Sequence, residues 1–177
     1  MKRAIRLIAA IIASFTVGIG LNSVHADPKF MDFNGNWQGS GTDRNLPFET
    51  TQRTSCRATV DADLRTMNSL VSCSGDAGLK KDIRLNIILD GDAFAGSLTQ
   101  RATTPGTSVT VLDGSVYGHA TDTTADFRVD FPGLMPKVTV TLRRDSASSF
   151  SMRASIWGAV LMDVTFDRTV HSINSGP

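Results

Sequence analysis

Apolar and polar residues alternate with a period of two along almost the whole chain after Phe33. Successive side chains of a β-strand point to opposite faces, so this alternation indicates half-buried strands, and few segments carry the spacing of an amphipathic helix. In the segment KVTVTLR, for example, Val138, Val140 and Leu142 share one face. The pattern therefore predicts an all-β protein.

The alternating segments are separated by turn residues such as Asp90 and Gly91, which favour tight hairpins and hence antiparallel neighbours. A chain of short consecutive strands predicts an antiparallel up-and-down barrel of about eight to ten strands, because closure removes exposed edges. A two-sheet β-sandwich is the alternative. The expected strands cover residues 34–42, 49–60, 67–74, 79–89, 93–102, 107–120, 123–131, 137–145, 148–157 and 159–170.

The first 26 residues have the pattern of a secretory signal peptide. A basic start is followed by an apolar stretch from Leu7 to about Leu21, which is shorter than a bilayer span requires. We expect cleavage near Ala26, leaving a single β-barrel domain of residues 27–177 that is periplasmic or secreted and does not span a membrane.

Charge and cysteine content narrow the possible partners and the redox environment. The 18 Lys and Arg residues nearly balance 17 Asp and Glu residues, which argues against nucleic acid as a partner. We interpret the basic pair Lys80 and Lys81 as solvated strand ends. Cys56 and Cys73 lie on neighbouring expected strands of an exported chain, so we predict a disulfide bond that joins one hairpin.

The sequence offers little catalytic machinery. It contains no nucleophile elbow, phosphate-binding loop or dinucleotide fingerprint. His119 and His171 lie outside metal-ligand spacing, and His119 with Asp122 is the one pairing compatible with acid–base chemistry. We therefore expect a protein that is not an enzyme and uses no metal or cofactor.

The segment GNWQGSGT places glycines beside a tryptophan on the inward face of the first strand. Glycine there permits close backbone approach at a barrel corner. We expect an interior that holds a small apolar or amphiphilic ligand. The residues expected to line it are Trp37, Phe94, Val129, Val140, Met152 and Met162.

The loop FPGLMP is unusual because its tip is apolar, with Phe131, Leu134 and Met135 between or beside two prolines. Such a loop at a barrel mouth could form a ligand entrance or contact a partner, since exposed apolar surface commonly marks binding. Alternatively, it folds back and seals the barrel.

The motif Gly35-x-Trp37, early in the first strand of an exported all-β chain, resembles the calycin superfamily of lipocalins, avidins and their bacterial relatives. This resemblance implies a lipocalin-like barrel in which Gly35 and Trp37 are structural and an arginine near the chain end stacks on the indole. Arg168 is the candidate for that arginine. The implied function is non-catalytic ligand binding.

The same motif with a single disulfide is similar to bacterial periplasmic inhibitors of metalloproteases, which are barrels with a free N-terminal arm. That resemblance implies that residues 27–33 form an arm. It gives the alternative function, a protein-interaction module such as a protease inhibitor or an envelope factor.

Overall fold

The computed structural model of the protein describes residues 30–133 and 135–169. The predicted signal peptide, residues 1–26, lies outside this part of the chain. A short 3-10 helix, η1 (Met31–Phe33), precedes ten strands. These are β1 (Gly35–Asp43), β2 (Gln52–Ala62), β3 (Thr66–Gly75), β4 (Lys80–Asp90), β5 (Ala93–Thr103), β6 (Thr110–Ala120), β7 (Thr124–Asp130), β8 (Val138–Ser146), β9 (Ser149–Ile156) and β10 (Ala159–Arg168).

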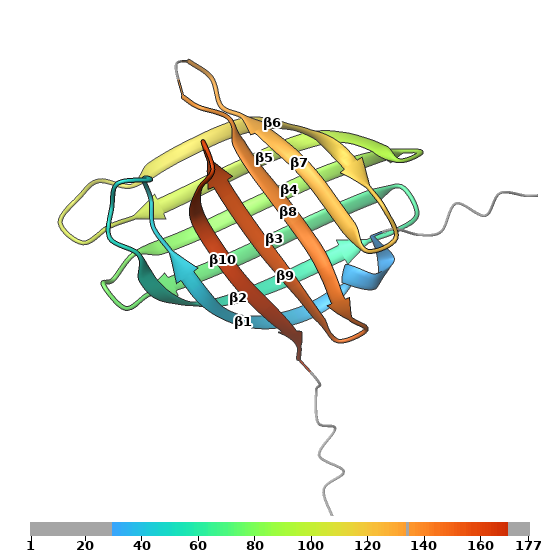
Figure 1. Cartoon of the computed structure of the whole chain (residues 1–177), viewed down its shortest axis with the longest axis horizontal. Coiled ribbons are helices and arrows are strands. Elements are labelled where there is room, and N and C mark those ends of the chain that lie inside the picture. The colour runs from blue at the N-terminus through green and yellow to red at the C-terminus, as the bar shows by residue number, and fades with distance from the viewer. Residues whose placement is uncertain (1–29, 134, 170–177) are drawn as a thin grey trace, which may run out of the picture.

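The strands form one closed antiparallel barrel (Figure 1). Each strand pairs with its sequence neighbours, and β1 also pairs with β10, so that Gly39 lies between Cys56 and Phe166. The predicted all-β up-and-down barrel is confirmed, and the sandwich alternative is wrong. Predicted strand limits fall within about three residues of those observed, because alternation reports the pleat of each strand directly.

The connections gather at the two ends of the barrel, which differ in character. At one end, on the left and upper left in Figure 1, lie the loops β1–β2, β3–β4, β5–β6 and β7–β8 and the turn β9–β10. We call this end the mouth. At the other end, η1 lies among tight turns, and Phe30 and Phe33 are buried. Residues 30–33 therefore belong to the barrel and do not form the free arm expected for this segment.

Aromatic side chains fill the end of the barrel beside η1. The ring of Phe150 is stacked on Phe166 at 4.7 Å and meets Trp37 and Phe33 edge-on at 4.9 and 5.4 Å. The indole Nε1 of Trp37 donates a hydrogen bond of 2.8 Å to the carbonyl oxygen of Phe33. These contacts make a packed plug, with edge-to-face geometry that adds to the burial of apolar area.

The glycines of β1 allow β10 to close the barrel. A methyl group on Gly41 would lie 2.0 Å from the backbone oxygen of Asp163, and one on Gly39 would lie 2.7 Å from the ring of Phe166. The expected close backbone approach is therefore present at the β1–β10 seam. The space beside Gly39 is filled by Phe166, so these glycines do not leave a void.

The predicted disulfide is confirmed. Cys56 on β2 and Cys73 on β3 lie directly opposite each other and are bonded, so the bridge joins a single hairpin. Both residues face the interior and are buried. Seventeen positions separate them in sequence, so the bond mainly restricts the unfolded chain.

Candidate functional site

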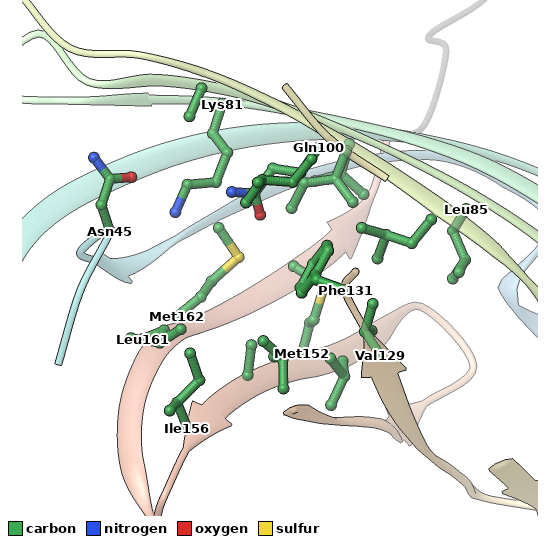
Figure 2. Close-up of a pocket in the computed structure, with 18 of the residues that line it drawn as sticks. Asn45, Lys81, Leu85, Gln100, Val129, Phe131, Met152, Ile156, Leu161 and Met162 are labelled. Carbon is green, nitrogen blue, oxygen red and sulfur yellow. The ribbon is translucent and has the colours of Figure 1, made fainter. Parts of the chain in front are cut away.

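Between the mouth and the aromatic plug, the barrel encloses a cavity of about 660 Å³. This volume lies within the range of about 300–1,000 Å³ typical of small-molecule sites. Its wall is mostly apolar and comes from inward positions on strands around the barrel (Figure 2). Deep lining residues include Phe33, Ala58, Val60, Met67, Val71, Leu85, Leu98, Phe127 and Phe150.

Four of the six expected lining residues face this cavity: Val129, Val140, Met152 and Met162. The other two, Trp37 and Phe94, are also buried but lie outside the cavity wall. Trp37 is part of the plug, and Phe94 packs between Phe30 and Phe127 at ring distances of 5.5 and 5.9 Å. Alternation predicts which face is inward but not the depth of a residue along the barrel axis.

The apolar loop β7–β8 lies at the mouth. Phe131 and Met135 line the cavity, and Met135 is also exposed to solvent. Leu134, the third residue expected in this loop, lies outside the described residues. Phe131 and Met135 thus form part of the cavity entrance.

Two further aromatic residues at the mouth were not predicted from the sequence. Phe48, in the β1–β2 loop, and Trp157, in the β9–β10 turn, line the cavity although their side chains are 83% and 84% exposed. Trp157 has φ of 50°, a left-handed conformation that is uncommon outside glycine. Their large exposed rings lie at the entrance of the cavity.

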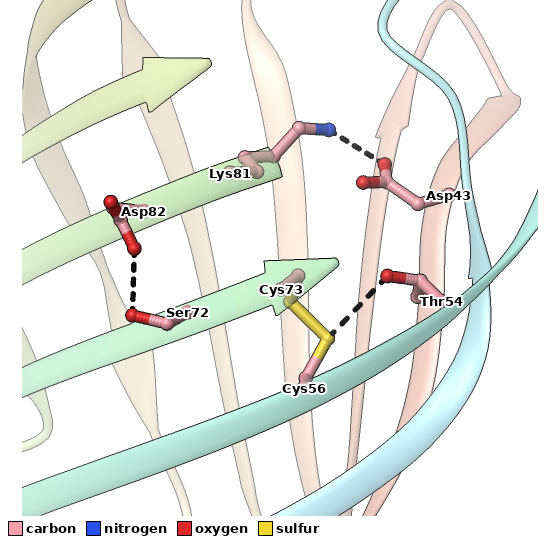
Figure 3. The surroundings of a disulfide bond; sticks show 7 residues. All are labelled: Asp43, Thr54, Cys56, Ser72, Cys73, Lys81 and Asp82. Carbon is pink, nitrogen blue, oxygen red and sulfur yellow. Dashed lines mark hydrogen bonds and ion pairs between the residues drawn. A yellow bond between two sulfur atoms is a disulfide. The ribbon is translucent and has the colours of Figure 1, made fainter. Parts of the chain in front are cut away.

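Lys81 and Asp43 form an ion pair inside the barrel, with Nζ 2.6 Å from Oδ1 (Figure 3). Their side chains are 5% and 1% exposed, so interpreting Lys81 as a solvated strand end was wrong. Asp43 ends β1 and Lys81 lies near the start of β4, both next to the mouth. The pair thus connects two strands that are separated in the barrel by β2 and β3.

Burial raises the pKa of Asp43 above its ordinary value of 3.8. Desolvation of the carboxylate is the largest cause, and the charge and hydrogen bond of Lys81, with a backbone hydrogen bond from Arg44, act in the opposite direction. The neighbouring ammonium thus offsets part of the cost of burying this carboxylate.

Other polar groups in the wall also lie at the mouth. Asn45 donates a hydrogen bond of 3.2 Å from Nδ2 to Oγ1 of Thr104, while its buried Oδ1 has no hydrogen-bond partner among the described residues. The half-buried amide of Gln100 also lines the cavity, as does Lys81 (Figure 2). Deeper in the barrel, Ser69 supplies a further hydroxyl. The polar groups of the cavity wall therefore lie mostly near the entrance, beside the aromatic and aliphatic side chains of the mouth, and the depth of the cavity is mainly apolar.

Arg168 covers the closed end of the barrel from outside. Its guanidinium carbon lies 4.5 Å from the ring centre of Trp37, and Nη2 donates a hydrogen bond of 2.9 Å to the carbonyl oxygen of Asp32. Gly35, which lies beside this guanidinium, has φ of 127°, a backbone conformation that residues with a side chain rarely adopt. The hydrogen bonds from Arg168 to Asp32 and from Trp37 to Phe33 hold η1 on the barrel.

The remaining candidates for chemistry lie away from the cavity. His119 is exposed on the outer face of β6, opposite Asp126 on β7; His171 lies outside the described residues. Within residues 30–133 and 135–169, no three potential metal ligands come together, and no helix is long and apolar enough to cross a bilayer.

The sequence did contain a signal for the ion pair. Lys81 is in phase with the inward residues Ile83 and Leu85, and Asp43 is in phase with Trp37. Extending each alternation by one step would have placed both charges inside. Charged side chains are rarely buried unless they are paired, so a strand pattern alone favours the solvent-exposed interpretation.

No family model, curated protein or solved structure matches this chain in the three comparisons made.

Proposed function

We propose that the protein is a non-catalytic binding module that carries a small apolar or amphiphilic ligand inside its barrel. The observation that supports this most is the cavity of about 660 Å³, which is lined mainly by aliphatic and aromatic side chains and has an entrance at the mouth. A pocket with an apolar wall and a few polar groups is the usual form of a ligand site.

The proposal includes a calycin-like ancestry and an exported location. The closed antiparallel barrel and the stacking of Arg168 on Trp37 support the first. The disulfide supports the second, because such bonds persist in oxidising compartments. The predicted signal peptide at residues 1–26 would direct export to the periplasm or the medium.

Native mass spectrometry of protein isolated from its producing cells tests ligand carriage, since a retained molecule adds a defined mass. Ala154→Phe is the variant that should block binding, because Ala154 lines the cavity and a benzyl group at this position would fill part of the cavity volume. Arg153→Phe, on the outward face of the same strand, is the control. The proposal requires that Ala154→Phe loses the molecule while Arg153→Phe keeps it; equal retention by both folded variants would contradict it.

The exposed rings of Phe48 and Trp157 favour a second candidate function, a protein-interaction module that uses the mouth. Large apolar groups in water commonly mark an interaction surface. The variant Phe48→Ser/Trp157→Ser tests it by cross-linking in the producing cells. Loss of a specific cross-linked partner with unchanged cavity binding would favour this candidate, and an unchanged cross-linking pattern would count against it.

A further inference from the structure

The ion pair of Lys81 and Asp43 is the feature of the barrel that apolar packing alone does not explain. Two charges taken out of water lose much of their hydration, and a pair of apolar side chains is often equally stable or more stable at such a site. The pair also lies beside a cavity of ligand size, with Lys81 in its wall. A role in recognising the ligand would account for both facts.

The ammonium of Lys81 retains hydrogen-bonding capacity toward the cavity. An ammonium carries three N–H donors, and one hydrogen bond of Lys81, to Oδ1 of Asp43, is present among the described residues. Asp43 is not part of the cavity wall. The group offered to a ligand at this point is therefore a donor, suited to an oxygen acceptor.

The charge of the pair selects among possible acceptors. Among the described cavity-lining residues, Lys81 is the one cationic side chain, and Asp43 neutralises it at 2.6 Å. A carboxylate ligand would bring an uncompensated negative charge into a largely apolar space and lie near the buried carboxylate of Asp43, both of which are unfavourable. An uncharged oxygen, such as that of an ester, ketone or alcohol, avoids both costs.

The position of the polar groups sets the orientation of such a ligand. Lys81, Gln100 and Asn45 lie toward the mouth, whereas the depth of the cavity is lined by Phe127 and by Phe150, which is part of the plug. An amphiphile that satisfies both regions would place its apolar body inside and its polar end near Lys81.

We propose that the ligand is an uncharged lipophile whose polar end carries a carbonyl or hydroxyl oxygen, and that this oxygen accepts a hydrogen bond from Lys81 held by Asp43. This inference rests on the proposed ligand-binding function. The ligand class concerns the same cavity.

The experiment is a displacement titration at pH 8 with the uncharged fluorescent probe N-phenyl-1-naphthylamine. The competing ligands share one chain length: methyl dodecanoate is an uncharged acceptor, dodecanoate is a carboxylate and dodecane lacks polar atoms. The variant Asp43→Leu/Lys81→Met removes both charges at once, which avoids leaving either one unpaired. Lys80→Met, on the exposed neighbouring position, is the control.

We expect wild type and Lys80→Met to bind methyl dodecanoate at least about tenfold more tightly than dodecanoate. In the double variant, affinity for the ester should fall about tenfold or more, as expected for loss of a hydrogen bond to a charged group, while affinity for dodecane stays unchanged. Tighter binding of dodecanoate than of the ester to wild type, or an unchanged ester affinity in the double variant, would overturn the inference while leaving the binding function intact. Failure of the folded wild type to take up the probe or any of the three ligands would overturn the proposed function as well.

Discussion

Removing one member of the buried ion pair should destabilise the barrel far more than removing both. Lys81→Met leaves the carboxylate of Asp43, 1% exposed, without its counter-ion, and Asp43→Leu does the same to the ammonium. Breaking a buried pair in this way costs about 3–5 kcal/mol. That is a large share of the roughly 5–15 kcal/mol by which a domain is stable. The double variant Asp43→Leu/Lys81→Met should regain wild-type stability to within about 1 kcal/mol or exceed it.

Urea denaturation at pH 7 measures these differences as free energies of unfolding. The signal is the fluorescence of the buried Trp37, recorded in a Trp157→Phe background because Trp157 is exposed. Lys80→Met, on the solvent face, is the control and should change the free energy of unfolding by no more than about 0.5 kcal/mol. The reasoning would be refuted if the double variant had as low a free energy of unfolding as the less stable single variant. It would also be refuted if the single variants were as stable as wild type.

Three further predictions concern the β1–β10 seam, the disulfide and pH. Gly41→Ala should lower the free energy of unfolding in denaturant titrations by about 1–3 kcal/mol or more, because its methyl group meets backbone across the seam; Ser40→Ala, facing outward, should have little effect, and equal effects would contradict this explanation. Cys56→Ala/Cys73→Ala should lower the free energy of unfolding by about 3 kcal/mol, as expected for a loop of this size. An unchanged midpoint of thermal unfolding would contradict this prediction. Because the pKa of Asp43 is raised on folding, the native state binds its proton more readily, so this group's contribution to stability falls as pH rises from about 4 through the raised pKa. The free energy of unfolding of wild type minus that of Asp43→Leu/Lys81→Met should therefore decrease over this window, and an increase would show that the sign is wrong.

The fold could be predicted from local sequence patterns, because the alternation of apolar and polar residues shows where each strand lies and which of its faces is buried. Alternation such as that of Val138, Val140 and Leu142 marks a strand with one buried face. The predicted turn near Gly91 is also present, displaced by one residue to Gly91 and Asp92, and makes β4 and β5 antiparallel neighbours. Ten such strands in succession favour closure, and the structure pairs the last with the first. The disulfide was predictable for the same reason, since hairpin register places Cys56 opposite Cys73.

The site was only partly predictable because it depends on position along the barrel axis. Trp37 and Val129 both face inward, yet the first belongs to the aromatic plug and the second to the cavity wall. This division arises because η1 and the aromatic rings fill one end, which no single strand encodes.

By itself, the sequence determined the strand order, the inward face of each strand and the disulfide, since all three depend on residues close together in the chain. Only the tertiary structure decided that the interior holds a cavity and that Asp43 and Lys81 meet within it, 38 positions apart in sequence. The physical reason is that enclosed volume and ion pairing depend on how distant strands curve toward one another, and this curvature exists only once the barrel has closed.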